Sequence, residues 1–239
     1  MKALILAAGK GSRIETETSG KPKSLLPLGD TTLLGQSLRQ FEEVGITDIV
    51  VVTGYQRHTI ASFLSENWAG SAEVVYNPHF ESTNVLYSFW LALPYLQKSD
   101  FVFLHADTVF EKAVLERLLS CESDETFVFA VDNHECEEEE MKVKVVDGYV
   151  TEVNKTMDPR GCDGEFLGVA RISGRHIESL RHHAEALFEE SEFQSFFERA
   201  VQRMIDQQGL QVSVADMTGL KWREVDFPED YAAARGFFS

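Results

Sequence analysis

The stretch Lys2–Ser24, KALILAAGKGSRIETETSGKPKS, decides the fold expected of this chain. It begins with an apolar run, Ala3 to Ala8, which has the length of one buried strand. The chain then enters a loop containing Gly9 and Gly11, and such a small-residue loop lets backbone N–H groups approach an anion closely. Four cationic side chains lie within fourteen residues here: Lys10, Arg13, Lys21 and Lys23. In a chain with a formal net charge of -17, this cationic loop indicates a site for a phosphorylated small molecule.

The loop fits neither of the two best-known phosphate-binding patterns. A P-loop needs Gly-x-x-x-x-Gly-Lys-Ser/Thr, whereas here Gly11 is followed by Ser12 and Arg13. The dinucleotide fingerprint Gly-x-Gly-x-x-Gly would need glycine at position 14, where Ile14 stands. On the residues alone, a surface turn with merely solvated cations stays open as an alternative.

Length and charge bound the remaining possibilities. At 239 residues the chain is long enough for one large domain, or for two small ones, and we expect a single domain over residues 1–239. The acidic balance argues against nucleic acid or an anionic membrane surface as a partner, because both need a basic face. No apolar run approaches the ~20 residues of a membrane helix, and the apolar start is shorter than a secretory signal. We therefore expect a cytoplasmic protein.

Three cysteines and one acidic run complete the compositional picture. Cys121, Cys136 and Cys162 are an odd number without a Cys-x-x-Cys pair. This pattern favours reduced thiols in a cytosolic protein and suggests neither a disulfide framework nor a zinc site. Five glutamates fall within Glu135–Glu140, and such a charge run is typical of a solvated loop.

The first eighty residues alternate strands and helices, which predicts a parallel sheet with right-handed crossovers. Beyond them, a polar loop leads into an apolar helix over 85–93, which Pro94 is expected to end or kink. The expected elements before that loop are the strands 3–8, 48–53 and 73–76 and the helices that follow Thr32 and Thr59. The expected fold class is therefore α/β, a Rossmann-like, mainly parallel mixed sheet with helices on both faces.

The pattern changes beyond residue 120. Residues 142–146 and 149–153 are joined by Asp147-Gly148, a strong signal for a β-hairpin. The other expected elements are strands at 126–131, 164–172 and 210–214 and helices at 175–187 and 192–208. This second half, 121–239, is thus expected to be mixed, with a small hairpin region.

The quoted stretch also resembles a known signature. The residues Leu6-Ala7-Ala8-Gly9-x-Gly11-x-Arg13, followed by Lys21-Pro22-Lys23, resemble the motif of the nucleotidyltransferases that make nucleotide sugars and CDP-alcohols. The resemblance implies a nucleotide-diphospho-sugar transferase-like fold in which residues 1–120 bind an NTP and residues 121–239 bind the acceptor. It implies that the loop Leu6–Gly11 wraps the triphosphate, and that Arg13 and Lys23 contact phosphates. Lys10 occupies a position that varies in that family.

A metal site is expected at the same edge. Asp107 ends the apolar run 100–107, and the carboxyl ends of parallel strands form the ligand-binding edge of such sheets. A carboxylate facing triphosphate oxygens needs a cation between them, and Mg²⁺ prefers carboxylate and phosphate ligands. The resemblance adds Asp226, in Trp222-Arg-Glu-Val-Asp226, as a second metal ligand. Helix capping stays open as the alternative role of both aspartates. His105, beside Asp107, is expected to be structural.

The resemblance also implies contacts for the base and the acceptor. It places Ser82 and Asn84 beside the nucleotide, although Asn84 could equally cap the helix that it begins. The residues expected to contact the acceptor are Tyr87, Trp90, Lys155 and Glu192. Core packing stays open as the role of Trp90.

Among the branches of this family, the sequence is most similar to small CTP-using enzymes that activate phosphocholine, 2-aminoethylphosphonate or inositol phosphate. Glu140-Met141 lacks the tryptophan that phosphocholine enzymes carry at the comparable place, which favours a primary amine over a quaternary ammonium. The expected reaction joins CTP, with Mg²⁺, to a small phosphorylated or phosphonate acceptor. Two alternatives remain: a sugar-1-phosphate nucleotidyltransferase using another NTP, and a non-catalytic nucleotide-binding regulator. The oligomeric state stays open.

Overall fold

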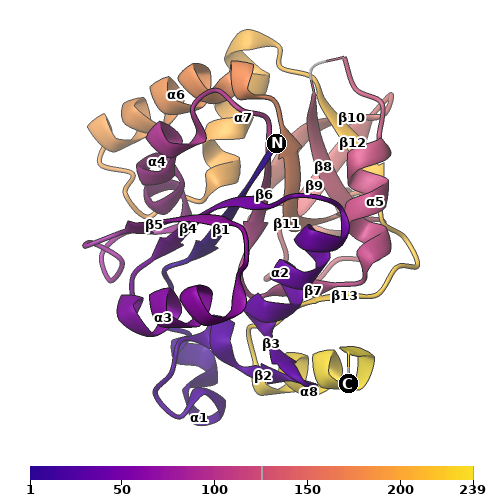
Figure 1. Cartoon of the computed structure of the whole chain (residues 1–239). Coiled ribbons are helices and arrows are strands. Elements are labelled where there is room, and N and C mark those ends of the chain that lie inside the picture. The colour runs from indigo at the N-terminus through magenta and orange to yellow at the C-terminus, as the bar shows by residue number, and fades with distance from the viewer. Residues whose placement is uncertain (125, 239) are drawn as a thin grey trace.

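A nine-stranded sheet runs through the computed structural model, which describes residues 1–124 and 126–238 (Figure 1). The strand order is β5-β4-β1-β6-β11-β8-β12-β10-β9. In chain order these strands are β1 (Lys2–Ala7), β4 (Asp48–Thr53), β5 (Ser71–Tyr76), β6 (Phe101–His105), β8 (Phe127–Asp132), β9 (Lys142–Val146), β10 (Tyr149–Asn154), β11 (Gly164–Ile172) and β12 (Val212–Asp216). The α/β mixed sheet expected from the sequence is confirmed.

The first four strands of that order are parallel, so their carboxyl ends meet at one edge. In β1, Leu6 pairs with His105 of β6, and Ala7 pairs with Thr53 of β4. Unbroken apolar runs suit such strands because helices cover both faces of a parallel sheet. The loops after β1 and β6 therefore begin side by side.

The sheet becomes mixed where β11 joins it, antiparallel to both β6 and β8. The hairpin β9–β10 extends the far edge, as the Asp147-Gly148 signal predicts. Asp147 and Gly148 have φ values of 51° and 83°, and two positive φ angles in a two-residue turn match the twist of a hairpin.

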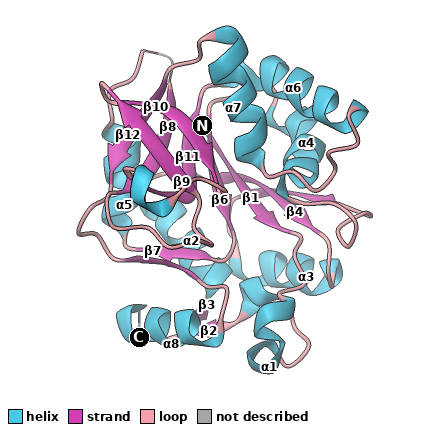
Figure 2. Cartoon of the chain, turned by 180° about the vertical axis from the view of Figure 1, so that it is seen from behind, coloured by secondary structure: helices cyan, strands magenta, loops and turns pink. Residues whose placement is uncertain are grey.

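Helices cover both faces (Figure 2). On one face lie α4 (Val85–Leu96), α6 (Ile177–Glu189) and α7 (Phe197–Gln208), and on the other lie α2 (Leu33–Glu43), α3 (Arg57–Asn67) and α5 (Lys112–Ser120). Alternation along β1 explains the two cores, because Leu4 and Leu6 face the first set of helices while Ala3 and Ile5 face the second. Neither core leaves an apolar helix exposed.

Two boundaries differ from the sequence-based expectation. Helix α4 continues through Pro94 to Leu96, because a proline in the last turn removes only one backbone donor. Helix α7 begins at Phe197 rather than at residue 192, so Glu192 lies in the turn that precedes it. None of the helices within the described residues has both the length and the apolar character needed to cross a membrane.

Two small two-stranded sheets and two short helices lie outside the nine-stranded sheet. The short strand β13 (Trp222–Glu224) pairs with β7 (Thr108–Phe110), and β2 (Pro27–Leu28) pairs with β3 (Thr31–Thr32). Helix α8 (Pro228–Phe238) packs against them, with Pro228 in its first turn as expected. The short helix α1 (Glu15–Thr18) follows the glycine loop. A third small core that includes Ile14, Leu28 and Tyr231 holds these pieces together.

Candidate active site

The glycine loop and the two predicted aspartates converge at the carboxyl edge of the parallel strands. The loop follows β1 and Asp107 follows the neighbouring strand β6. Asp226 arrives from the far end of the chain because β13 pairs with β7, and the Val225 N–H donates to the Asp107 carbonyl at 3.0 Å. Residues more than one hundred positions apart therefore share one site.

Lys23 lies between the two aspartates. Its Nζ is 2.5 Å from Asp107 Oδ2 and 2.7 Å from Asp226 Oδ1. Burial by itself lowers the pKa of Lys23, but the two carboxylates outweigh burial and hold the pKa above its ordinary value. Burial likewise raises the pKa of Asp107, and the charges of Lys23 and His105 outweigh it, so the pKa is lowered. Lys23 and Asp107 are therefore both charged at neutral pH.

Arg13 forms the outer part of this charge cluster. Its Nη1 lies 3.2 Å from Asp226 Oδ2, and its guanidinium lies 5.4 Å from the centre of the Phe227 ring. Half of the Arg13 side chain remains exposed. Arg13 and Lys23 therefore lie in one charge cluster with the two aspartates, and their phosphate contacts stay predictions.

The loop itself is shaped by its glycines. Gly11 has a φ of 70°, and a Cβ there would lie 2.8 Å from Lys23 Cβ, so a larger residue would both strain the backbone and displace the lysine. A Cβ on Gly9 would meet no atom within 4 Å, because Gly9 borders an open cavity. Lys10 is exposed, with Nζ 6.0 Å from the centre of the Tyr55 ring.

The two aspartates fit a divalent metal. Because oxygens of both contact the same Lys23 Nζ, both can also reach one bound cation. Donor atoms of His105, Asp107 and Glu224 also lie within 4.8 Å of one another. Carboxylate oxygens are the ligands that Mg²⁺ prefers in proteins. Neither aspartate is a helix N-cap, since Asp230 Oδ2 accepts from the N–H groups of Asp226 and Phe227 and Asp107 precedes a strand.

A cavity of about 350 Å³ opens beside this charge cluster. That volume lies within the usual range for small-molecule sites. The lining includes Gly9, Arg13, Asn84, Asp107, Lys155 and Glu198. The cavity thus joins the glycine loop, the two aspartates and the second half of the chain.

Glu198 is the residue in this cavity that sequence reasoning missed. It lies in the first turn of α7, its side chain is buried, and neither carboxylate oxygen has a hydrogen-bond partner within the described chain. Burial raises the pKa of Glu198, and the charges of His105 and Lys155 only partly offset this. A buried carboxylate without a partner is costly, so its presence in a cavity points to a ligand that supplies the partner.

Lys155 lines the same cavity, as the sequence predicts. Its Nζ lies 5.1 Å from the centre of the Phe196 ring, and that ring also lines the cavity. No ion pair joins Lys155 to Glu198 among the described residues, although the charge of Lys155 offsets part of the rise in the pKa of Glu198. The Lys155 ammonium and the Glu198 carboxyl group therefore line the same cavity without pairing with each other.

The other predicted contact residues take several positions. Asn84 lines the cavity and also caps α4, since its Oδ1 accepts from the Val85 N–H at 2.9 Å. Ser82 lies in the preceding turn, where its carbonyl accepts from Gln194 Nε2. Among the loop residues, Leu6 and Ala8 line the cavity, whereas Ala7 points into the core of the opposite face.

Tyr87, Trp90 and Glu192 lie outside the cavity lining given above. Tyr87 and Trp90 pack together with Phe188 of α6, with ring centres 5.5–5.8 Å apart. Glu192 accepts from Ser195 Oγ at 3.0 Å and lies 3.4 Å from Arg199 Nε. Their acceptor contacts stay predictions, and these partners explain the three side chains without a ligand.

Comparison with known proteins agrees with this geometry. A model of the MobA-like NTP transferase domain matches residues 3–208. The chain therefore belongs to the MobA-like NTP transferase domain family, a class of nucleotidyltransferases, as the motif in residues 2–24 predicts.

Individual relatives narrow the similarity. The chain is 29% identical over 249 residues to the CMP-5'-(3-aminopropyl)phosphonate synthase of Streptomyces rubellomurinus, covering 100% of this chain and 39% of that protein. It is 29% identical over 236 residues to the bifunctional IPC transferase and DIPP synthase of Aquifex aeolicus, and the match covers 98% of this chain and 51% of that protein. The chain thus spans about half or less of these two curated relatives. The solved structure of the inositol-1-phosphate CTP transferase of T. maritima shares the fold, with a TM-score of 0.83 and 20% sequence identity. The match covers 98% of this chain and 94% of that one.

Proposed function

We propose that this protein is a Mg²⁺-dependent cytidylyltransferase whose acceptor is a small phosphonate or phosphate monoester carrying a primary amine. An oxygen of the acceptor attacks the α-phosphorus of CTP, the α–β bridging bond breaks, and pyrophosphate leaves. Relatives named for CMP-aminopropylphosphonate synthesis and for CTP transfer support CTP as the donor. Residues 1–120 would bind CTP, and residues 121–239 would bind the acceptor.

The first part of the mechanism is charge neutralisation. Arg13 and Lys23 lie at the mouth of the glycine loop and would turn toward the triphosphate, exchanging their present carboxylate partners for phosphate oxygens. Asp107 and Asp226 would hold Mg²⁺, which supplies positive charge beside the α-phosphate. Such transfer depends on positioning and charge rather than on a covalent protein intermediate.

The observation that carries the acceptor assignment is that Glu198, whose carboxylate has no hydrogen-bond partner within the described chain, lines the same cavity as Lys155. A zwitterion with a phosphonate at one end and an ammonium at the other would satisfy both. A primary ammonium donates N–H bonds to a carboxylate, whereas a quaternary ammonium has none to donate and binds aromatic faces. Lys155 Nζ lies over the Phe196 ring, and the ring of Phe166 stacks on that of Phe129 with their centres 4.0 Å apart. Because one face of each ring is already occupied, these two residues are poorly placed to form an aromatic cage.

The test measures pyrophosphate release in the presence of Mg²⁺ for every combination of a nucleotide (CTP, UTP, ATP, GTP or dTTP) with an acceptor from a matched set. The decisive pair is 3-aminopropylphosphonate and propylphosphonate, which differ only in the amine, with phosphocholine and glucose-1-phosphate as further acceptors. We expect turnover with CTP and the amine, at least ~10-fold above the amine-free acceptor, because a charged hydrogen bond is lost without it. Turnover with another nucleotide and glucose-1-phosphate would move the protein to the sugar-nucleotide branch. Nucleotide binding without turnover would favour the regulator.

A further inference from the structure

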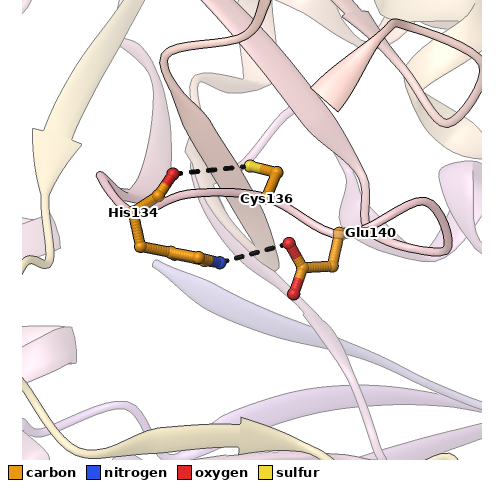
Figure 3. A group of neighbouring side chains, drawn as sticks. All are labelled: His134, Cys136 and Glu140. Carbon is orange, nitrogen blue, oxygen red and sulfur yellow. Dashed lines mark hydrogen bonds and ion pairs between the residues drawn. The ribbon is translucent and has the colours of Figure 1, made fainter. Parts of the chain in front are cut away.

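A second group of chemically reactive side chains lies in the loop between β8 and β9. Donor atoms of His134, Cys136 and Glu140 all lie within 4.8 Å of one another, and His134 Nε2 is 3.1 Å from Glu140 Oε2 (Figure 3). The Cys136 side chain is buried, and those of His134 and Glu140 are only partly exposed. Three different ligand types therefore face one point.

A second cysteine lies close to Cys136 and comes from another segment. Burial and the neighbouring thiol of Cys162, just before β11, raise the pKa of Cys136. Cys162 Sγ donates to the Pro159 carbonyl at 3.1 Å. Glu165, buried within β11, places Oε2 3.6 Å from His134 Nε2. His134 Nδ1 is buried and makes no hydrogen bond within the described chain. The loop cluster is defined here as His134, Cys136, Glu140 and Cys162.

The surrounding run of glutamates is a loop with exposed side chains at Glu135, Glu137, Glu138 and Glu139, as the sequence predicts, and one buried lysine anchors its backbone. Lys142 is fully buried, and its Nζ donates to the backbone carbonyls of Glu137, Glu138 and Glu140 at 2.7–3.2 Å. Glu140 Oε2 also accepts from the Glu137 N–H at 2.9 Å. The loop is thus wrapped around one lysine, which binds three of its backbone carbonyls.

We propose that the loop cluster binds one zinc-class divalent cation. Two thiolates, one imidazole and one carboxylate match the nitrogen, sulfur and oxygen donors of four-coordinate Zn²⁺ sites. Ligand distances of roughly 2.0–2.3 Å require neighbouring donors to approach one another closely, as His134 and Glu140 do. Magnesium would not compete, because it is a hard cation that prefers all-oxygen ligands. On binding, each thiol releases its proton to the buffer.

Such a metal would tie the acidic loop to the segment before β11 and so fix one wall of the site. Glu139 of this loop lies 3.7 Å from Arg13, and a cavity of about 500 Å³ between the loop and α8 is lined by Glu139 and Asp226. A cation would also offset the repulsion among the loop carboxylates. This role is structural and independent of the chemistry at Asp107, and it is an alternative to the expectation that the cysteines bind no zinc.

The test is Co²⁺ titration of the reduced, metal-free protein in excess Mg²⁺, which occupies the carboxylate centre. We expect one equivalent of Co²⁺ to produce a thiolate-to-cobalt charge-transfer band and the intense visible bands of a tetrahedral site, and Zn²⁺ to abolish both. An absorbance spectrum without a thiolate band would overturn the proposal, because Co²⁺ would then lie only at oxygen ligands.

Variants locate the site. Cys136→Ser and His134→Gln should each weaken Co²⁺ and Zn²⁺ binding by more than the ~10–100-fold that loss of an outer partner costs. Cys121→Ser is the matched control, since that thiol lies at the end of α5, 3.7 Å from the Val214 carbonyl. An unchanged band in Cys136→Ser, with circular dichroism showing a folded protein, would contradict the assignment. Glu140→Gln gives a second, milder readout if either variant fails to fold.

Discussion

The aspartate edge and the neighbouring cavity handle buried charge in opposite ways. At the edge, Lys23 contacts both Asp107 and Asp226, so each of these charges has a partner within the chain. In the cavity, Glu198 is buried with neither oxygen hydrogen-bonded within the described chain. Under the proposed function the two regions would have different tasks: the edge would exchange its partners when nucleotide arrives, whereas the cavity would be completed only by the acceptor. We expect substrate selectivity to reside in the cavity and catalytic rate at the edge.

Removing one edge carboxylate should have the largest effect. We expect Asp107→Asn to lower kcat by about 10³-fold or more, because one charged metal ligand is lost from the reacting phosphate. The side-chain shape is kept, and Asp226 still pairs with Lys23, so the fold should survive. Pyrophosphate release measures the rate, and circular dichroism checks the fold.

Asp30→Asn is the matched control for this variant. Asp30 is 80% exposed and pairs only with Arg39 at the surface, so its loss should leave kcat unchanged. Near-normal kcat in Asp107→Asn would refute the metal role and leave the edge as a purely structural ion pair.

Glu198→Gln should have an intermediate effect confined to the acceptor. We expect kcat/KM for an amine-bearing acceptor to fall ~10–100-fold, because a charged hydrogen bond is replaced by a neutral one. KM for CTP should not change, and neither should the rate with an amine-free acceptor. Steady-state kinetics with both acceptors measure the split.

The variant Glu192→Gln distinguishes Glu198 as the partner of the acceptor amine from Glu192, the acidic residue that the sequence analysis expects to contact the acceptor. Glu192 is partly exposed and already bonded to Ser195, so its loss should not change acceptor selectivity. If Glu192→Gln loses the amine preference while Glu198→Gln keeps it, the sequence-based assignment holds and the cavity assignment fails.

The two regions also differ in how far the sequence could predict them. The loop after β1 and Asp107 after β6 follow from apolar runs and the rule that parallel strands end at one edge. Asp226 was reached through resemblance, because nothing in residues 222–230 reveals that β13 pairs with β7. Only the first two predictions rest on local patterns, and the structure brings Asp107, Asp226 and Lys23 of the loop segment together.

Glu198 could not be predicted in the same way. An acidic residue in the first helical turn is ordinarily a partner of the helix dipole. Its burial depends on α7 packing against β6, where Phe197 stacks on Phe103 at 4.5 Å across about ninety residues of sequence. Likewise, Trp90 Nε1 donates a hydrogen bond to Glu185 Oε1 on α6 at 3.0 Å. The sequence pattern around residue 90 could not predict this contact, because its partner lies on a distant helix.

The smallest predicted effect extends the comparison to stability and pH. Burial, reinforced by Glu140 and Glu224, raises the pKa of Glu165 to about 9. The folded state therefore holds this proton more tightly than the unfolded chain, whose carboxyl titrates near its ordinary value. Stability from this group is complete in acid and is lost as pH rises toward 9. Asp107, with its lowered pKa, has the opposite sign and loses its contribution only as pH falls below its ordinary range.

Glu165→Gln should therefore raise the melting temperature at pH 8 in the presence of a chelator, by about 3–6 °C for roughly 1–2 kcal/mol. The gain should shrink toward zero as the pH falls below the ordinary glutamate pKa of about 4.3, since the wild-type carboxyl is then protonated in both states. Glu152→Gln, on the exposed face of β10, is the control and should shift neither curve. A gain that is the same at both pH values would show that the change acts through packing, and that Glu165 does not titrate as a buried acid.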